Sequence, residues 1–221
     1  MLRVTFRHSG NQGKTLNGSD HQKTITLVFI SLAGFLSCIN PIYPKQMLLQ
    51  HAATVIIIGL LTWDIKKAFL TYGAFLGIAL FVLLHIIGAR YIYSYVPYNN
   101  WSITVFGWDI QQTFGFERNH YDRLVHFLFG ILIFPFLMNV FVRRFSFKQA
   151  ILVSFLCLQT FSMVYELFEW LLTLMLSNRE AENYNGQQGD VWDAHRDMAL
   201  AMLGAGIAAL YYRIVRNKSA V

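Results

Sequence analysis

Acidic residues and histidines recur at helical spacing in three stretches of an otherwise apolar sequence. In the first stretch, Asp122 and His126 are four residues apart. On a helix they lie one turn apart on the same face, a spacing at which a carboxylate and an imidazole can share a metal ion or a proton. The alternative is an aspartate that caps the helix, with a histidine packed below it.

The second stretch is a pair of glutamates, Glu166 and Glu169, inside a long apolar run. They are three residues apart and therefore share a helix face. A charged residue at the bilayer centre costs about 2.5–3.5 kcal/mol on insertion scales, so two of them together require partners. The alternative to a functional pair is a neutralised or salt-bridged pair, with Arg123 as its partner, that only fixes helix packing.

The third stretch carries Asp190, Asp193 and Asp197, which fall at i, i+3 and i+7. This spacing predicts one helical stripe, whereas His195 and Arg196 are predicted to point elsewhere. Three carboxylates on one stripe repel each other unless a cation or a basic residue lies among them. The alternative is the helix macrodipole, which favours acidic residues at a helix start and would account for the first two better than for the third.

We predict that the three stretches meet in one polar site near one membrane face. The candidate site residues are Asp122, Arg123, His126, Glu166, Glu169, Asp190, Asp193 and Asp197. The candidate metal ligands among them are Asp122, His126, Glu166, Asp193 and Asp197. Oxygen-rich ligation favours Mg²⁺ or Mn²⁺ as a divalent cation, or Zn²⁺ if His120 joins His126. The sequence has no P-loop, H-E-x-x-H or nucleophile-elbow motif, so no catalytic residue is assigned.

The elements that position this site are predicted to be membrane-spanning helices, because 55% of the residues are hydrophobic and only 14% are charged. Six apolar runs are near the length that a hydrocarbon slab of about 30 Å requires. They are 24–39, 47–63, 68–88, 124–142, 150–176 and 197–215. The first run is interpreted as a retained span, because no small-x-small cleavage site follows it. The predicted fold is an all-α polytopic membrane protein with about six transmembrane helices.

The chain divides accordingly into five regions. They are a basic tail (1–23), transmembrane helices one to three (24–88), an outer aromatic-rich loop (89–123), transmembrane helices four to six with the polar cluster (124–215), and a second tail (216–221). If the amino terminus lies inside, twelve of the eighteen Lys and Arg residues fall on its side of the membrane. Both termini are therefore predicted to be cytoplasmic and the polar site to face outward.

Basic and small residues suggest what lies next to the helices. The formal net charge is +6, but the Lys and Arg residues lie between apolar runs instead of forming one patch. Lipid headgroups are therefore the expected partners and nucleic acid is not, while the sequence identifies no protein partner.

Cys38 and Cys157 lie in separate apolar runs and are predicted to be free thiols. Ala201, Gly204, Ala205 and Ala208 form a small-residue face that predicts close packing of the last helix.

The three polar stretches also carry a family resemblance. Residues 118–127, 165–169 and 189–198, within a region of about 88–210, resemble the YjdF family of bacterial inner-membrane proteins. That resemblance implies a multi-pass protein of the bacterial inner membrane and names no reaction. A looser likeness extends to the VanZ-like proteins, which are linked with glycopeptide-antibiotic tolerance. The positions that match their pattern are Asp122, Arg123, His126, Glu166, Asp193 and Asp197, and the chain departs from it at Glu169, where Gln is usual, and in its added first spans.

Three functions fit these observations. In the first, a divalent cation held by the carboxylates acts on or recognises a phosphate or a polar headgroup of a lipid or another envelope component. In the second, buried acids carry protons or cations through an ion-coupled transporter, although the first three spans show no charge at membrane depth. In the third, the polar network only locks the helices together during folding or assembly. We rank the first function highest and leave open whether the protein is an enzyme.

Overall fold

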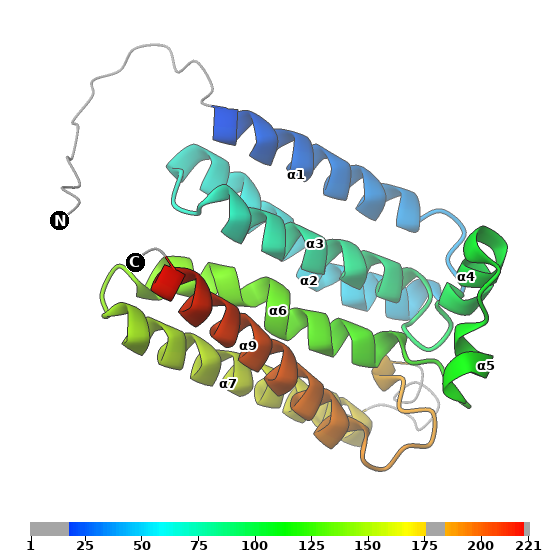
Figure 1. Ribbon diagram of the computed structural model, residues 1–221. Helices are drawn as coiled ribbons and strands as arrows, with labels where there is room; N and C mark the ends of the chain where they lie inside the picture. Colours follow the sequence, from blue (N-terminus) through cyan, green and yellow to red (C-terminus); the bar gives the residue numbers. More distant parts are fainter. Residues whose placement is uncertain (1–17, 176–183, 219–221) are drawn as a thin grey trace.

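The computed structural model describes residues 18–175 and 184–218 (Figure 1). The described secondary structure is entirely helical. The helices are α1 (Gly18–Ser37), α2 (Pro44–Lys67), α3 (Tyr72–Arg90), α4 (Tyr98–Phe106), α5 (Ile110–Phe114), α6 (Tyr121–Phe141), α7 (Phe147–Met175) and α9 (Asp193–Lys218). Residues 1–17 of the predicted basic tail and 219–221 of the second tail lie outside the described residues.

Five of these helices, α2, α3, α6, α7 and α9, are long and apolar enough to cross a membrane. They confirm the prediction of an all-α, multi-pass membrane protein. The helix of the first predicted span, α1, is not among the five, because Asp20 and Lys23 and other polar residues occupy its first turns. It begins at Gly18, earlier than the predicted span, and packs along α3 and α2. At 29 residues, or about 44 Å, α7 is longer than a hydrocarbon slab is thick.

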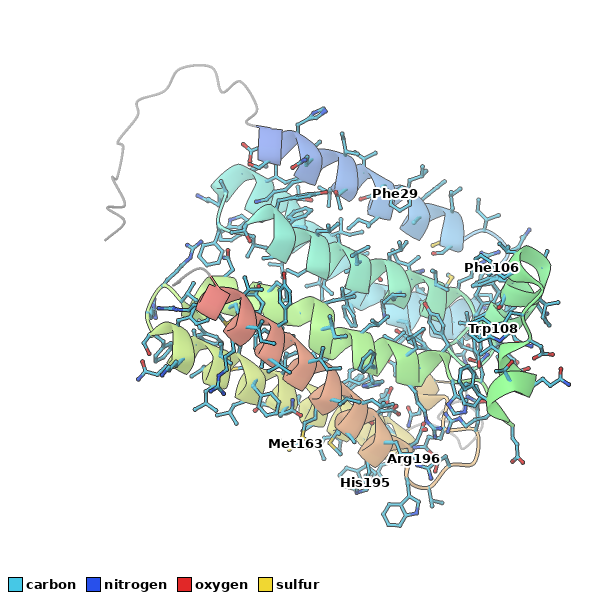
Figure 2. All side chains as sticks on the ribbon, viewed as in Figure 1. Phe29, Phe106, Trp108, Met163, His195 and Arg196 are labelled. Carbon is cyan, nitrogen blue, oxygen red and sulfur yellow. The ribbon has the colours of Figure 1, made fainter. Side chains whose placement is uncertain are left out.

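Successive long helices alternate in direction (Figure 1). The amino-terminal ends of α2, α6 and α9 lie at the end of the bundle where α4 and α5 form a cap, and the described chain begins and finishes at the opposite end. We call these the capped end and the open end. Phe106 and Trp108 project from the cap and are 78% and 46% exposed, as aromatic residues of a membrane interface are (Figure 2). The predicted aromatic loop therefore contains two short helices.

The helices form two groups, α1–α3 and α6, α7 and α9, which α3 and α6 join. The close approach of α9 to α6 depends on glycine. A methyl group on Gly204 would lie 2.1 Å from the carbonyl oxygen of Phe127, and one on Gly130 would lie 2.3 Å from that of Ala201. The small-residue face predicted on the last helix is thus confirmed, and it brings the first turns of α6 and α9 together.

A buried ion pair ties α1 to α2 at the open end. The ammonium of Lys23 donates to Asp64 at 2.6 Å and to the carbonyl of Leu70 at 2.7 Å. The other oxygen of Asp64 accepts from the backbone N–H groups of Phe69 and Leu70. The pair joins residues that lie just outside the first two predicted runs, 24–39 and 47–63. The sequence did not predict it, because the two charges lie on different helices and only the packed structure pairs them.

Candidate functional site

The predicted site residues gather at the capped end, where α6, α7, α9 and the segment before α9 meet. They form two groups that differ in depth and in charge. We call the outer group the arginine layer, which consists of Arg118, Arg123, Arg196, Asp190 and Asp193. We call the inner group the acidic pocket, which consists of Asp122, His126, Glu166 and Asp197.

In the arginine layer, three guanidinium groups converge on Asp190. Arg118 donates to Asp193 at 2.7 Å and lies 3.4 Å from Asp190. Arg123 and Arg196 also donate to Asp190. These charge-assisted bonds tie the segment before α9 to the start of α6 and hold both helices in register.

Three sequence predictions need correction in this layer. Asp190 is not on the stripe of Asp193 and Asp197, because it lies in the turn before α9 and accepts from the backbone N–H of Trp192 at 3.0 Å. The turn follows Gly189, whose φ of +80° is one that glycine adopts without strain. Arg196 reaches back to Asp190 instead of pointing elsewhere.

His195 points away from the site, as predicted, and is exposed (Figure 2). Its ring packs edge-on against that of Trp192. The other correction concerns Arg123, which pairs with Asp190 and not with the glutamates of α7. The reason is geometric, since Arg123 follows Asp122 on α6 and therefore points to a different side of that helix.

Two titratable groups in the outer segments respond to these arginines. Burial opposes ionisation of Asp190, but the backbone N–H of Trp192 and the three arginines outweigh it and hold its pKa below the usual range. Burial lowers the pKa of His120, and the neighbouring arginines lower it further. The ring of His120 stacks on Phe116 with centroids 4.0 Å apart. His120 therefore belongs to the outer layer, and the structure does not bring it to His126.

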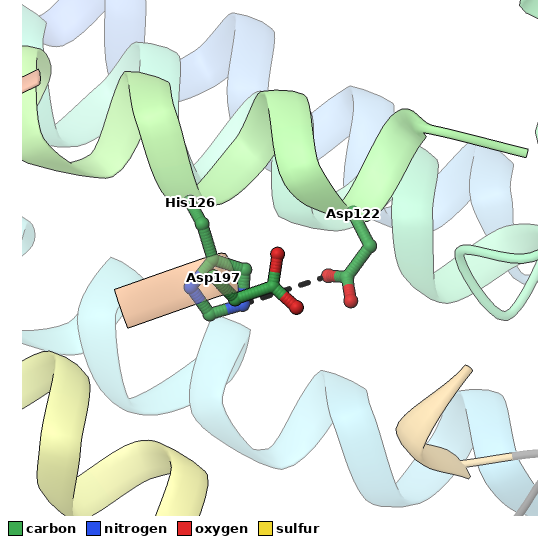
Figure 3. A group of neighbouring side chains, drawn as sticks. All are labelled: Asp122, His126 and Asp197. Carbon is green, nitrogen blue, oxygen red and sulfur yellow. Dashed lines mark ion pairs between the residues drawn. The ribbon is translucent and has the colours of Figure 1, made fainter. Parts of the chain in front are cut away.

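The acidic pocket brings ligand atoms from α6, α7 and α9 to one point. The Nε2 atom of His126 lies 3.7 Å from an oxygen of Asp122 and 3.5 Å from Oε1 of Glu166. One ligand atom from each of Asp122, His126 and Asp197 lies within 4.8 Å of the other two, and Figure 3 shows these side chains pointing toward one another. Ligands of a single metal ion, each about 2.0–2.6 Å from it, have separations of this order.

The pocket also contains buried oxygen atoms whose hydrogen-bonding capacity is unmet. Glu166 and Asp197 are only 6% and 2% exposed. The Oε1 atom of Glu166 and the Oδ1 atom of Asp197 are buried and have no hydrogen-bond partner. Since leaving a buried oxygen unpaired is costly, the two carboxylates require either a cation or protons.

Four of the five predicted metal ligands thus come together. The fifth, Asp193, belongs to the arginine layer, where Arg118 holds it. Glu169 lies one turn beyond Tyr165 on α7 and beside its hydroxyl group, toward the capped end. Sequence reasoning did not include Arg118 among the site residues, although its charge next to the first polar stretch was a usable signal.

A cleft of about 310 Å³ reaches the acidic pocket from the membrane-embedded part of the bundle. Its walls come from α2, α3, α6 and α7 and from Tyr93, which follows α3, and they are mostly apolar and aromatic, with Asp122 and His126 at one end. His85 and Tyr93 also line it, joined by a hydrogen bond of 2.5 Å, and His85 contacts the carbonyl oxygen of Gln50 at 3.0 Å. No pattern within one segment of the sequence indicates this cleft, because helices from both groups form it.

Comparisons with known proteins agree with this architecture. Residues 23–218 match a family profile described as "Predicted membrane protein (DUF2238)". The inner membrane protein YjdF of Escherichia coli (strain K12) is 31% identical over 161 residues, which cover 72% of this chain and 73% of that protein. No solved structure matches the chain. The match to YjdF confirms the resemblance that the three polar stretches carry.

Proposed function

Since the chain belongs to the DUF2238 family of predicted membrane proteins, whose description names no reaction, we propose a function from its own site. The acidic pocket binds a divalent cation at the capped end and presents it to a phosphate-bearing component of the membrane. In the predicted orientation this end faces outward, at the level of the lipid headgroups. The proposed ligands are Asp122, His126 and Asp197, with Glu166 as the fourth.

The observation that carries the proposal is the pair of unpartnered buried oxygens beside the cluster. An acidic cluster alone fits a proton-sharing network equally well. Here, however, the unpartnered Oε1 atom of Glu166 lies 3.5 Å from Nε2 of His126. Asp197, which also has an unpartnered oxygen, brings a carboxylate oxygen to the same imidazole. A cation accepts electron pairs from all of these atoms at once, whereas each shared proton satisfies only two.

The charge balance of the two groups supports the same conclusion. The two groups contain three guanidinium groups and five carboxylates, those of Asp122, Glu166, Asp190, Asp193 and Asp197, and Glu169 beyond them adds a sixth carboxylate. With His126 neutral, as a metal ligand must be, the excess is three negative charges at the edge of a low-dielectric medium. A divalent cation removes two of them. Mg²⁺ and Mn²⁺ suit the three carboxylates, and the imidazole also permits Zn²⁺.

Thermal melting of the purified protein in detergent tests the cation site. After treatment with a chelator, adding Mg²⁺, Mn²⁺, Ca²⁺ or Zn²⁺ should raise the melting temperature, since a ligand at a hundred times its dissociation constant stabilises the native state by about 2.7 kcal/mol. The response should disappear in Asp197→Asn. It should persist in Asp109→Asn, a matched change at the α5 N-cap, where the amide oxygen still accepts from Gln112. A wild-type protein that responds to none of the four ions refutes the proposal.

A polar stripe on α7 favours a second candidate, an ion-coupled transporter. Below Glu166 toward the open end, Ser162, Gln159 and Ser154 follow at intervals of three to five residues. Each has a buried side-chain atom without a hydrogen-bond partner. Such a stripe, about 18 Å long at 1.5 Å per residue, would suit a path for protons.

Proteoliposomes separate the transporter from the cation-binding function. With a pH gradient across the membrane, a proton path predicts dissipation that Glu166→Gln and Ser154→Ala both slow. Cation binding alone predicts that the gradient persists in the wild type and in both variants, while the melting response to the ion is lost in Glu166→Gln and retained in Ser154→Ala.

A further inference from the structure

The cleft beside the acidic pocket has the shape and lining of a site for one hydrocarbon chain. Its volume of about 310 Å³ is near the lower end of the usual range for ligand pockets. Phe81 and Phe129 contact each other across its floor with ring centroids 5.3 Å apart. Among the described lining residues, hydroxyl groups belong to Tyr93, Ser162 and Tyr165, and the other polar side chains are those of His85, Asp122 and His126. A single acyl chain fits this space better than a polar ligand does.

The cleft opens sideways, toward the lipid. Ala53 on α2 is exposed, and Phe161 and Tyr165 on α7 are 49% and 39% exposed, so these three residues form a rim at the protein surface. The rim lies between helices that belong to different groups, since α2 packs against α1 and α3 whereas α7 packs against α6 and α9. A lipid in the bilayer can therefore insert one chain and leave its second chain outside.

The end of the cleft fixes the chemistry of the headgroup. Asp122 and His126 form this end, so a phosphate attached to the inserted chain meets the cation proposed there. The excess negative charge is three before the cation binds and one afterwards. An anionic lipid would increase it. The ammonium group of phosphatidylethanolamine balances its own phosphate, so this lipid leaves the excess at one. Glu169, about one helical turn beyond Tyr165 toward the capped end, offers the ammonium a carboxylate.

We propose that the cleft binds an aminophospholipid, with one acyl chain between α2 and α7, its phosphate on the cation of the acidic pocket and its ammonium toward Glu169. This inference rests on the proposed cation-binding function, because the cation is what makes the acidic end accept a phosphate. It adds a substrate class, a direction of entry through the membrane and a preference among headgroups.

Photo-crosslinking in proteoliposomes that contain Mn²⁺ tests the proposal. The probes are phosphatidylethanolamine and phosphatidylglycerol with the same diazirine-bearing acyl chain, and labelled peptides are mapped by mass spectrometry. Labelling of Phe129 on the cleft floor is divided by labelling of Phe29, which is 58% exposed on α1 and reports the surrounding lipid (Figure 2). We expect the ethanolamine probe to give a higher ratio than the glycerol probe. Equal ratios, or a preference for glycerol, overturn the headgroup assignment.

Two alanines that are neighbours on α2 provide a variant and its control. Ala53→Trp places a large side chain on the rim, whereas Ala52→Trp adds the same group to an exposed position that does not line the cleft. We expect the first to lower the ratio about tenfold, the factor that about 1.4 kcal/mol of lost binding represents, and the second to leave it unchanged. A ratio that Ala53→Trp does not change overturns binding in the cleft.

Removing the metal ion with EDTA separates this inference from the function on which it rests. We expect EDTA to reduce the ratio as Ala53→Trp does. If Ala53→Trp blocks labelling but EDTA has no effect, an acyl chain does occupy the cleft, but the proposal that the cation binds the phosphate is refuted. If the melting temperature responds to Mn²⁺ but labelling ignores Ala53→Trp, the cation site stands and the lipid assignment is refuted.

Discussion

Replacing Gly204 by alanine should damage the fold and the acidic pocket together. The added methyl group would lie 2.1 Å from the carbonyl oxygen of Phe127, whereas ordinary contacts are 3.4–4 Å. The α9 backbone must therefore retreat from α6 by roughly 1 Å, because a carbonyl within a helix cannot turn away. Overpacking of this kind costs about 1–3 kcal/mol, or about 2–12 °C in melting temperature for a chain of this size.

The same displacement separates the proposed ligands. Asp197 is two helical turns before Gly204 on α9, while Asp122 and His126 are on α6. A metal site tolerates a misplacement of only about 0.5 Å, so Gly204→Ala should also lose the stabilisation by Mn²⁺. Thermal melting with and without Mn²⁺ measures both effects.

Gly206→Ala is the matched control for this experiment. It is the same change two residues along α9, and an added methyl group there meets nothing within 4 Å. We expect its melting temperature and its response to Mn²⁺ to stay near those of the wild type. If the Gly204 and Gly206 variants melt alike, the close packing of α9 on α6 does not hold the pocket together.

Three further predictions test other parts of the molecule. Folding lowers the pKa of Asp190, so the stability that its carboxylate contributes is fully present above its unfolded pKa of about 3.9 and is lost as the pH falls through its lower folded pKa. Melting curves between neutral and acid pH should show this loss in the wild type and less of it in Asp190→Asn. Lys23→Met should lower the free energy of unfolding, measured with a chemical denaturant, by about 3–5 kcal/mol, because it leaves the carboxylate of Asp64 buried without its ion-pair partner. Adding Asp64→Asn should recover part of this loss. A double variant less stable than Lys23→Met contradicts the buried pair. Reporter fusions after Lys67 should report the cytoplasm and fusions after Asn100 the outside, and a cytoplasmic signal at Asn100 would place the acidic pocket at the wrong face for an outer-leaflet lipid.

Helix spacing alone predicted the part of the site that lies within single helices. Asp122 and His126 share a helix face because they are four residues apart in the sequence. In the structure, Oδ1 of Asp122 lies 3.7 Å from Nε2 of His126. Of the six apolar runs predicted to span the membrane, five correspond to helices long and apolar enough to do so, since length and composition are local properties. The two cysteines, Cys38 and Cys157, are free, as their separate runs predicted.

Features that depend on turns or on pairs of helices were not predictable in this way. Asp190 lies off the predicted stripe because the chain turns at Gly189. In this position it accepts hydrogen bonds from both Arg123 and Arg196. The Lys23–Asp64 pair joins residues 41 positions apart, and no periodicity reports such a contact. The cleft requires four helices at once. The orientation of the termini and the likeness to VanZ-like proteins stay predictions.

In the proposed function, Asp122, His126 and Asp197 hold one divalent cation. Electron paramagnetic resonance of the purified protein with Mn²⁺ tests it most directly, because the spectrum counts bound ions and reports nitrogen nuclei attached to the metal. We predict one bound Mn²⁺ per chain with a nitrogen coupling that His126→Gln removes, and no tight binding in Asp197→Asn. Absence of bound Mn²⁺, or a nitrogen coupling that survives in His126→Gln, would contradict the claim.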